Sequence, residues 1–306
     1  MRGLENIRVG VIGVGVMGKN HVRVYKELGC ELVGIADVDK ERVEEVSRLY
    51  GTRAFMSYKE LLNSRIDAVS IAVPTTFHGK VALDAINAGV NVLVEKPIAD
   101  SVKSALEIIE AAKKRSVKLM VGHVERFNPV VEVIKERIAH ADVISISTVR
   151  VGPLPPRIKD VGVVLDLATH DIDLARYLTE SEPVEIYSFI SSSLYNKEDT
   201  ALIMLKMENG VLVNINVNWL TPFKVREISI ATADKFIRGW LIEQKVREYV
   251  RHGDDSYIVK ELKVPYDEPL KLELSAFVES IIKDKPVPVS GEDGLKVLEV
   301  AELCMM

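Results

Sequence analysis

Cysteines are few and long apolar runs are absent in this sequence of 306 residues, and each shortage excludes a class of protein. The two cysteines, Cys30 and Cys304, lie near opposite ends of the chain. This spacing excludes a C-x-x-C metal or redox motif and fits a reducing cytoplasm. No stretch approaches the roughly 18 consecutive apolar residues of a membrane-spanning helix. We therefore expect a cytoplasmic protein without a membrane partner.

A surplus of positive charge is also missing. Asp and Glu number 45 against 40 Lys and Arg, which gives a formal charge of −5. A protein that grips nucleic acid or an anionic membrane normally carries a basic patch, so we expect neither partner. The one glutamine, Gln244, stands beside many Glu, Lys and Arg residues. This bias is typical of proteins from thermophiles.

The order of apolar and amphipathic segments indicates two kinds of architecture. Apolar stretches such as 7–13 and 66–74 alternate with helix-period segments through the first 120 or so residues. Short connections between them predict an α/β fold, a doubly wound parallel Rossmann sheet over residues 1–122. Longer strand-like stretches predict a second α+β domain, with a large and mostly antiparallel open sheet, over residues 123–285. We expect the last segment, 286–306, to be a helix that packs back near the first domain.

The segment 200–219 predicts how the second domain is built. Two alternating runs, TALIMLKM and VLVNINVNW, flank the turn residues ENG, which is typical of a β-hairpin. In the second run the apolar residues share one face of the strand and the three asparagines share the other. Either solvent or a second subunit can cover this open face. We expect a homo-oligomer, a dimer or tetramer, formed through it.

The first predicted strand ends in a glycine-rich turn with the sequence GVGVMG. Glycines at the offsets G-x-G-x-x-G allow a tight turn, close approach of the backbone to a pyrophosphate, and close packing of the next helix. The predicted dinucleotide contacts in this turn are Gly13, Gly15, Val16, Met17 and Gly18.

Asp37 stands at the end of the second predicted strand, about 20 residues after the turn. A carboxylate at this place accepts hydrogen bonds from the adenosine ribose and repels a 2′-phosphate, so NAD is favoured over NADP as the cofactor. Lys40 and Arg42 follow closely and weaken this preference. In the alternative interpretation the glycines form only a turn, and Asp37 only caps the next helix.

Two later strand ends face the crevice in which an open α/β sheet binds its ligands. One strand ends at Pro74 and Thr75, and the other ends at Glu95 and Lys96, in the sequence EKP. We predict that these four residues contact the cofactor and that Lys96 also reaches the substrate. His78 is a further predicted cofactor contact, although capping of the next helix explains it equally well.

Four motifs, in this order along the chain, resemble the Gfo/Idh/MocA family of glucose-fructose oxidoreductase and inositol dehydrogenase. They are GVGVMG (13–18), PTTFH (74–78), EKP (95–97) and DLATHDID (166–173). The resemblance covers essentially the whole chain. It implies a nicotinamide-dependent oxidoreductase that acts on a secondary alcohol of a sugar, cyclitol or sugar nucleotide. It also implies that Lys96, Asp166 and His170 surround the reacting carbon.

The chemistry of these three side chains agrees with catalysis. Asp166 and His170 are four residues apart, so they share one face of a helix. A neutral imidazole can take the hydroxyl proton while Asp166 orients the ring or touches the substrate. Lys96 would stabilise negative charge that develops on the oxygen. The alternative is that Asp166 and His170 form a surface salt bridge. No cluster has metal-ligand spacing, and we expect no metal.

The segment GHVERFNP, residues 122–129, follows another strand that ends at the crevice. Its form resembles the branch of the family that oxidises UDP-N-acetylglucosamine at the sugar 3-hydroxyl to a 3-keto sugar nucleotide. A diphosphate needs cations, and Arg offers bidentate donors for phosphate. The predicted substrate contacts, beside Lys96, Asp166 and His170, are His123, Arg126, Arg150 and Arg157, with Lys159 as a further cation.

Other functions stay open at this point. Dehydrogenation of inositol or a free sugar would leave the arginines without a diphosphate, as ordinary solvated cations. A regulatory module could keep the dinucleotide fold and sense its ligand without turnover. A sensor has no need of a full proton-transfer set, so the joint presence of Lys96, Asp166 and His170 favours an enzyme.

Overall fold

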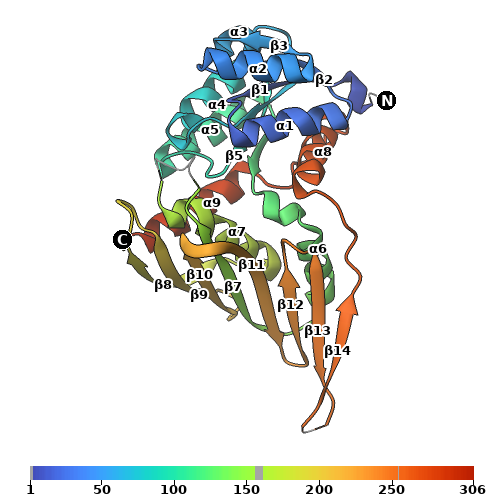
Figure 1. Ribbon diagram of the computed structural model, residues 1–306, viewed down its shortest axis with the longest axis vertical. Helices are drawn as coiled ribbons and strands as arrows, with labels where there is room; N and C mark the ends of the chain where they lie inside the picture. The colour runs from blue at the N-terminus through green and yellow to red at the C-terminus, as the bar shows by residue number, and fades with distance from the viewer. Residues whose placement is uncertain (1–2, 156–160, 254) are drawn as a thin grey trace. The chain divides into compact units, whose positions relative to one another are not determined.

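The computed structural model describes residues 3–155, 161–253 and 255–306, and the chain divides into two compact units (Figure 1). The first unit comprises Met1–His123 and Leu270–Leu298, and the second comprises Val124–Pro269 and Glu299–Met306. In the described ranges no helix combines the length and apolarity that crossing a membrane requires.

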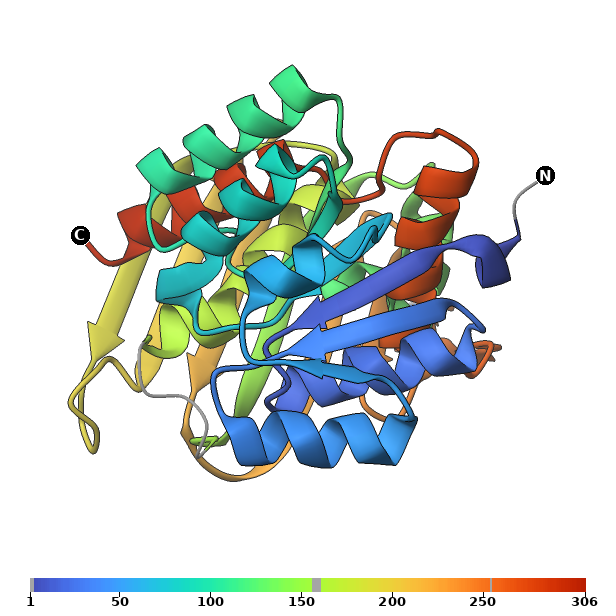
Figure 2. The same cartoon turned by 90° about the horizontal axis from the view of Figure 1, so that it is seen from above.

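The first unit is built on a parallel six-stranded sheet in the order β3-β2-β1-β4-β5-β6. Its strands are β1 Arg8–Ile12, β2 Glu31–Ala36, β3 Arg53–Phe55, β4 Ala68–Ile71, β5 Asn91–Glu95 and β6 Leu119–Gly122. Helices lie on both faces of the sheet, and the central strands are almost continuously apolar and buried (Figures 1 and 2). The strand order reverses between β1 and β4, where ligands of such sheets bind. The predicted doubly wound fold is confirmed.

The helices of this sheet begin and end at residues suited to those places. They are α1 Val16–Glu27, α2 Lys40–Tyr50, α3 Tyr58–Leu62, α4 His78–Asn87 and α5 Val102–Arg115, with the short helices η1 Leu4–Asn6 and η2 Thr75–Phe77. Asp39 caps α2 because its side chain accepts a hydrogen bond from the Arg42 amide, and α2 ends at Gly51 in a left-handed conformation. Ser101 caps α5 in the same way.

The last two helices require a correction to the predicted domain limits. They are α8 Pro269–Ile282 and α9 Gly291–Cys304. Residues 270–298 belong to the first unit, whereas the sequence analysis placed α8 in the second domain. The Val121 amide of β6 donates to the Val289 carbonyl (3.1 Å), and Leu274 and Phe277 of α8 are fully buried. The unit to which α8 belongs is thus made mainly of residues remote in sequence, and the periodicity of α8 does not reveal this.

The second unit is built on an eight-stranded sheet in the order β14-β13-β12-β11-β7-β10-β9-β8. Its strands are β7 Val143–Pro153, β8 Pro183–Ser191, β9 Thr200–Met207, β10 Leu212–Asn218, β11 Leu220–Thr232, β12 Lys235–Trp240, β13 Lys245–Arg251 and β14 Tyr257–Leu262. The pair of β7 and β10 is parallel and the other pairs are antiparallel. The predicted large, mostly antiparallel sheet is confirmed.

The hairpin of β9 and β10 shows why the sheet has two different faces. The predicted antiparallel hairpin is present, with Met204 paired to Asn214, and Gly210 in its turn has a φ of +89°. Along β10, Val213 and Ile215 are buried while Asn214 is exposed. One face therefore carries the core of the unit and the other is open.

The helices of the second unit are α6 Pro129–Ile138, α7 Thr169–Thr179 and the short helices η3 Val124–Phe127 and η4 Val164–Ala168. The predicted helix over about 163–178 is present, but its first turn, η4, is a π-helix. The Thr169 hydroxyl donates to the Leu165 carbonyl (2.9 Å), and the Thr169 amide reaches the Val164 carbonyl five residues back. The side chain thus competes with the backbone for the usual acceptor, which explains the wider turn.

Candidate functional site

Each glycine of the turn between β1 and α1 has a separate structural reason. Gly13 has a φ of +83°, and a Cβ there would lie 2.6 Å from the Ala72 carbonyl oxygen. A Cβ on Gly18 would lie 1.8 Å from the Gly13 oxygen, so α1 can pack this closely only without a side chain. A Cβ on Gly15 would meet no heavy atom within 4 Å. The turn is therefore tight on two sides and open at Gly15.

This open side fits the pyrophosphate of a dinucleotide. The helix α1 begins at Val16, and its first turn contains no acidic residue that would compete for the N-terminal amides. Val16 is 61% exposed and Met17 is half-buried, so both predicted contacts lie where the backbone meets solvent. The space beside Gly15 lets an anion approach the backbone.

Asp37 follows β2 and is held against the glycine turn. Its Oδ2 accepts a hydrogen bond from the Val14 amide (2.8 Å) and its Oδ1 accepts one from the Asp39 amide (2.9 Å). The alternative in which Asp37 caps the next helix is wrong, because Asp39 caps α2. Arg42 lies 3.4 Å from Asp37 and 2.8 Å from Asp39. The site thus holds a fixed carboxylate with an exposed cation beside it.

The ends of β4 and β5 carry the other predicted cofactor contacts. Pro74 is exposed and Thr75 is half-buried after β4, and Lys96 is half-buried after β5. Lys96 precedes a cis peptide bond to Pro97. The parallel strands thus bring these residues to the carboxyl edge of the sheet, at the same edge as the glycine turn.

His78 requires a correction. It is 1% exposed, with Nδ1 2.7 Å from the Pro97 carbonyl oxygen and Nε2 3.0 Å from the Val73 carbonyl oxygen. Both ring nitrogens face backbone acceptors, so the predicted cofactor contact gives way to a structural role. The histidine links the chain after β4 to the chain after β5.

Glu95, the last residue of β5, also points inward. Its Oε1 lies 2.8 Å from Nε2 of His21 on α1, and His21 is fully buried. Burial raises the pKa of Glu95, but the hydrogen bond to His21 and the nearby charges of Lys96 and His78 bring it below its usual value. The predicted contact of Glu95 with the cofactor is therefore replaced by a buried hydrogen bond to His21.

Sequence reasoning missed His21, although a signal for it exists. Val22, Val24 and Tyr25 are the apolar residues buried along α1, and His21 stands among them. A polar residue on the buried face of an amphipathic helix needs a partner, and that partner is Glu95. The sequence alone does not identify which buried acid is the partner of His21.

The second unit carries the other two predicted catalytic residues on one continuous helical stretch. Asp166 lies in the π-helical turn η4 and is 4% exposed, and His170 lies in the first turn of α7 and is half-buried. The alternative of a surface salt bridge is contradicted by the burial of Asp166. Burial and the positive charge of Arg150 lower the pKa of Arg226 on β11 to about 10. The negative charge of Asp166 acts in the opposite direction and raises this pKa. π-Helical turns occur frequently at functional sites.

Arg150 is 2% exposed and does not face solvent. Its guanidinium donates to both carboxylate oxygens of Asp171 (2.9 and 3.1 Å) and to Glu125 (2.6 Å). Burial alone would lower the pKa of Arg150, but Asp171 and Glu125 raise it above its usual value. A diphosphate would have to displace these carboxylates, so we correct the predicted substrate contact to a structural ion pair.

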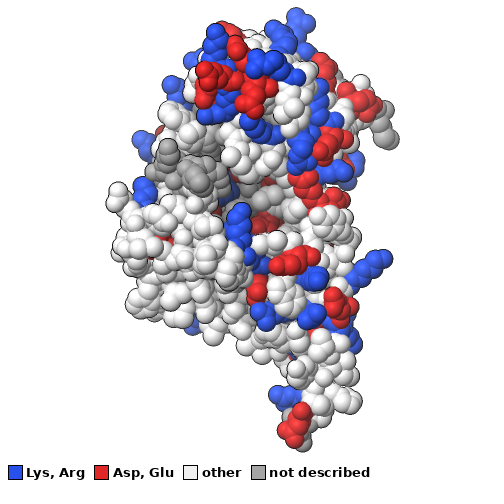
Figure 3. Space-filling model, in the orientation of Figure 1, with Lys and Arg blue, Asp and Glu red and all other residues white. Residues whose placement is uncertain are grey.

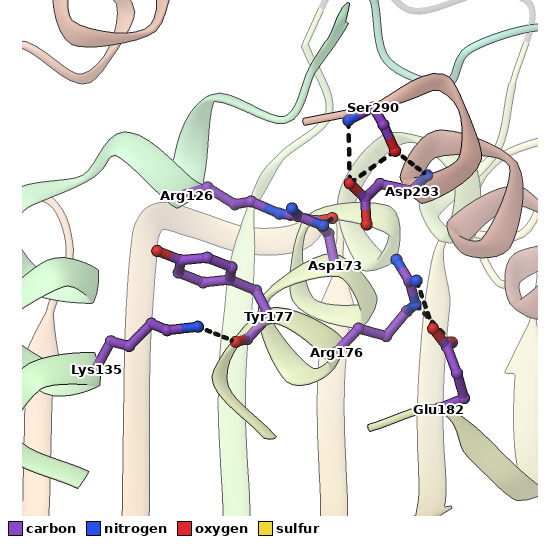
Figure 4. A network of polar contacts seen from close by, with 8 residues as sticks. All are labelled: Arg126, Lys135, Asp173, Arg176, Tyr177, Glu182, Ser290 and Asp293. Carbon is purple, nitrogen blue, oxygen red and sulfur yellow. Dashed lines mark hydrogen bonds and ion pairs between the residues drawn. The ribbon is translucent and has the colours of Figure 1, made fainter. Parts of the chain in front are cut away.

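Arg126 has a similar environment (Figure 4). It donates Nε and Nη2 to the two oxygens of Asp173 (2.7 and 2.6 Å), and the side chains are 8% and 1% exposed. Its guanidinium also lies 5.1 Å from the ring centroid of Tyr177. In Figure 4 the Lys135 side chain reaches the carbonyl of the same tyrosine (2.8 Å). The predicted phosphate contact is again replaced by a bidentate internal pair.

The remaining predicted contacts differ in what can be said of them. His123 is 1% exposed after β6, as the last residue of the first segment of the first unit. Arg157 and Lys159 lie outside the described residues. In the part of the chain that is described, no group of three or more His, Cys, Asp or Glu side chains is arranged to hold a metal ion.

Comparison with known proteins agrees with this architecture. Residues 7–123 match the model described as oxidoreductase family, NAD-binding Rossmann fold, and residues 148–235 match the GFO/IDH/MocA C-terminal domain. A solved structure of a levoglucosan dehydrogenase in complex with NADH and levoglucosan superposes with a TM-score of 0.88 at 21% identity, covering 98% of this chain and 96% of that one. At that identity the likeness shows the fold alone.

Two relatives are similar over nearly their full length. The UDP-N-acetylglucosamine 3-dehydrogenase of Acidithiobacillus ferrooxidans is 30% identical over 97% of this chain and 95% of the relative. Its solved structure superposes with a TM-score of 0.92, covering 97% of this chain and 96% of that one. The inositol 2-dehydrogenase of Rubrobacter xylanophilus is 36% identical over 100% of this chain and 92% of the relative. The chain therefore belongs to the Gfo/Idh/MocA family, as an NAD(P)-binding dehydrogenase that acts on CH–OH groups.

Proposed function

We propose that this protein oxidises a secondary hydroxyl of a sugar nucleotide, the 3-hydroxyl of UDP-N-acetylglucosamine, to a 3-keto sugar. One observation carries the choice of substrate. The structure of UDP-N-acetylglucosamine 3-dehydrogenase superposes with a TM-score of 0.92 at 30% identity, over 97% of the chain. In this proposal the first unit binds NAD, and the second unit binds the substrate and forms the oligomer.

The proposed catalytic roles follow from the chemistry of three side chains. The glycine turn would hold NAD, and the bound cofactor would supply the hydride acceptor. His170, which is half-buried, takes the hydroxyl proton at a ring nitrogen. Asp166, which is 4% exposed, orients the imidazole or the substrate. The Lys96 ammonium stabilises the negative charge that develops on the oxygen. No residue in this scheme requires a metal.

The preference for NAD over NADP is part of the proposal. Asp37 is fixed by the Val14 amide and places a carboxylate where the adenosine ribose would lie. A 2′-phosphate would meet this negative charge. Arg42 beside it is already within 3.4 Å of Asp37 and 2.8 Å of Asp39, which reduces its capacity to attract a phosphate.

Two observations favour a second candidate, the dehydrogenation of inositol or a free sugar. The inositol 2-dehydrogenase of Rubrobacter xylanophilus is 36% identical over the whole chain. In addition, Arg126 and Arg150 form ion pairs with carboxylates of their own unit, so a diphosphate would have to replace these partners. A polyol is uncharged and needs no cationic side chain, whereas the diphosphate of a UDP-sugar would need cationic residues other than these two.

Absorbance of NADH separates these substrates. The purified protein is mixed with NAD and either UDP-N-acetylglucosamine, free N-acetylglucosamine, or a panel of inositols and free sugars. We expect reduction with the UDP-sugar and a kcat/KM at least 100-fold lower with free N-acetylglucosamine. Reduction with polyols alone would establish the second candidate. If nothing reduces NAD, extraction of the protein in denaturant tests whether it already carries bound dinucleotide.

Variants test the proposed roles. We expect Lys96→Ala and His170→Ala to lower kcat at least 100-fold while the NAD dissociation constant and melting temperature stay near those of the native protein. Matched controls are Lys103→Ala and His140→Ala, which remove exposed residues of the same types. Native turnover in either test variant would exclude the role assigned to that residue.

We also propose that the open face of the second sheet forms the subunit interface. Tyr187, Phe189, Leu202 and Met204 of β8 and β9 are 48–76% exposed. This part of the open face borders a hollow of about 320 Å³ that also includes Leu212. In Figure 3 few charged side chains lie over β8 to β10 on the face in view. Apolar patches of this kind mark protein contacts.

Light scattering after size exclusion tests this interface. We expect a dimer or tetramer for the native protein and a monomer for the double variant Phe189→Glu and Met204→Glu. The control Leu49→Glu places the same charge at an exposed leucine of α2 and should leave the mass unchanged. A native monomer, or a double variant of native mass, would exclude the sheet face as the interface.

A further inference from the structure

A cluster of three buried side chains surrounds the chain at Lys96. His21 comes from α1, Glu95 is the last residue of β5, and His78 begins α4. They are 0%, 9% and 1% exposed. None of them has a role in the proposed chemistry. Glu95 precedes Lys96 and contacts His21, and His78 contacts Pro97, which follows Lys96. The cluster therefore needs an explanation of its own.

The residue before Lys96 is anchored through its side chain. Oε1 of Glu95 lies 2.8 Å from Nε2 of His21, and the two side chains are 12% and 0% exposed. A buried acid and imidazole in such contact resist displacement, because either one left alone would be desolvated without a partner. Since His21 lies on the helix that begins at the glycine turn, the pair also ties the end of β5 to the dinucleotide-binding turn.

The residue after Lys96 is anchored through its backbone. The carbonyl of Pro97 faces Nδ1 of His78 (2.7 Å), and Nε2 of the same ring faces the carbonyl of Val73 (3.0 Å). One imidazole thus bridges the chain after β5 and the chain after β4. The next residue, Ile98, is fully buried and prevents the segment from moving outward.

We propose that His21, Glu95 and His78 are positioning residues for Lys96: they fix the chain on both sides of the lysine. This inference rests on the proposed catalytic role of Lys96. A lysine side chain is flexible, so its aim depends on a rigid base and on neighbouring charge. A displacement of about 1 Å at a catalytic group can lower the rate about 100-fold.

The charge distribution around Glu95 agrees with this arrangement. His21 hydrogen-bonds the carboxylate, and Lys96 and His78 act on it through their charges, so that its pKa lies below the usual value in spite of burial. Glu95 is therefore held as a buried carboxylate next to the residue whose position is at issue. Removing this charge while keeping the shape is the sharpest perturbation of the cluster.

The test uses Glu95→Gln in the full chain, with Tyr25→Phe as a matched control. The control removes another buried hydrogen bond of α1, between Tyr25 and Ser70 (2.7 Å), on the same helix as His21. We expect Glu95→Gln to lower kcat at least 10-fold with the KM for NAD within twofold of native. Tyr25→Phe should leave kcat within twofold. A loss of kcat in both variants would indicate a general structural effect and overturn the inference.

Two further measurements separate this inference from the proposed function. If Lys96→Ala keeps native kcat, the proposed function fails whatever Glu95→Gln does. If Lys96→Ala loses activity and Glu95→Gln keeps it, only the positioning role fails. Hydrogen exchange of the backbone amides of Glu95, Lys96 and Ile98 needs no turnover. It should accelerate several-fold in Glu95→Gln and stay native in Tyr25→Phe, and unchanged exchange in Glu95→Gln overturns the inference.

Discussion

Gly15→Ala is the change that best separates binding of the dinucleotide from folding. The backbone at Gly15 has φ −65° and ψ −155°, an extended conformation, and a Cβ there would meet no heavy atom within 4 Å. We therefore expect the free energy of unfolding to change by less than about 1 kcal/mol, since loss of glycine also restricts the unfolded chain.

The same methyl group would occupy the space proposed for the pyrophosphate. An amide approaches a phosphate oxygen to about 2.9 Å, and a methyl carbon cannot come so close. Loss of two hydrogen bonds to a charged group, at about 1.5–3 kcal/mol each, weakens binding by about 3–6 kcal/mol. Each 1.4 kcal/mol corresponds to tenfold, so the dissociation constant for NAD should rise at least about 100-fold.

Calorimetric titration with NAD and urea unfolding measure the two effects on one preparation. Gly152→Ala is the control, because a Cβ there meets first the flexible Lys224 side chain, far along the chain from the turn. Gly18→Ala should instead lose folding and binding together, since its Cβ would lie 1.8 Å from the Gly13 oxygen. An affinity for NAD within threefold of native in Gly15→Ala would refute the assignment of the turn.

Three further predictions concern charge. Arg150→Met should lower the free energy of unfolding by about 3–5 kcal/mol in urea titrations, because it leaves the Asp171 carboxylate buried without its cation. Hydrogen bonds from Arg137 hold the pKa of Glu248 below its usual value. The stability that this pair contributes is present above the unfolded pKa of about 4.3 and is lost as the pH falls through the lowered folded pKa. Between pH 5 and pH 3 the native protein should therefore lose more unfolding free energy than Arg137→Met. Asp37→Ala should weaken NAD binding in calorimetry and raise the ratio of NADP to NAD affinity.

Each of these has a contrasting outcome. Arg247→Met breaks an exposed ion pair with Glu261 (3.4 Å) and should change the free energy of unfolding by less than about 1 kcal/mol. An equal loss in Arg150→Met would contradict the importance of burial. Parallel pH curves for native and Arg137→Met would remove Glu248 from the acid response. An unchanged NADP to NAD ratio in Asp37→Ala would leave the carboxylate with only its hydrogen bonds to the turn.

The sequence predicted the parts of the fold that depend on neighbours in the chain. Strands buried on both faces are almost wholly apolar, so their alternation with helices identified the parallel sheet. The spacing of Gly13, Gly15 and Gly18 identified the turn, because the turn needs a residue without a side chain at each of these positions. The family could be identified because its four motifs are short local stretches that occur in the same order along this chain.

What the sequence did not show depends on partners remote along the chain. Arg150 pairs with Asp171, 21 residues later, and with Glu125, 25 residues earlier, so it resembled a free cation. His21 and Glu95 are separated by 74 residues. The Thr169 hydroxyl competes with the backbone amide for the Leu165 carbonyl and so produces the π-helical turn. The spacing of apolar residues in the sequence does not reveal this competition. The sequence prediction assigned α8 to the second domain, because the rest of the first unit, residues 1–123, lies far upstream of it.

The division of the first unit between two stretches of chain has a consequence for its synthesis. The Val121 amide of β6 donates to the Val289 carbonyl, and Gly294 packs against Ile98 and Val121. A ribosome must therefore complete the whole second sheet before these residues emerge. Until then the nascent first unit lacks the segment that packs against Ile98 and Val121. The first unit thus reaches its final form only after residues 270–298 have been made.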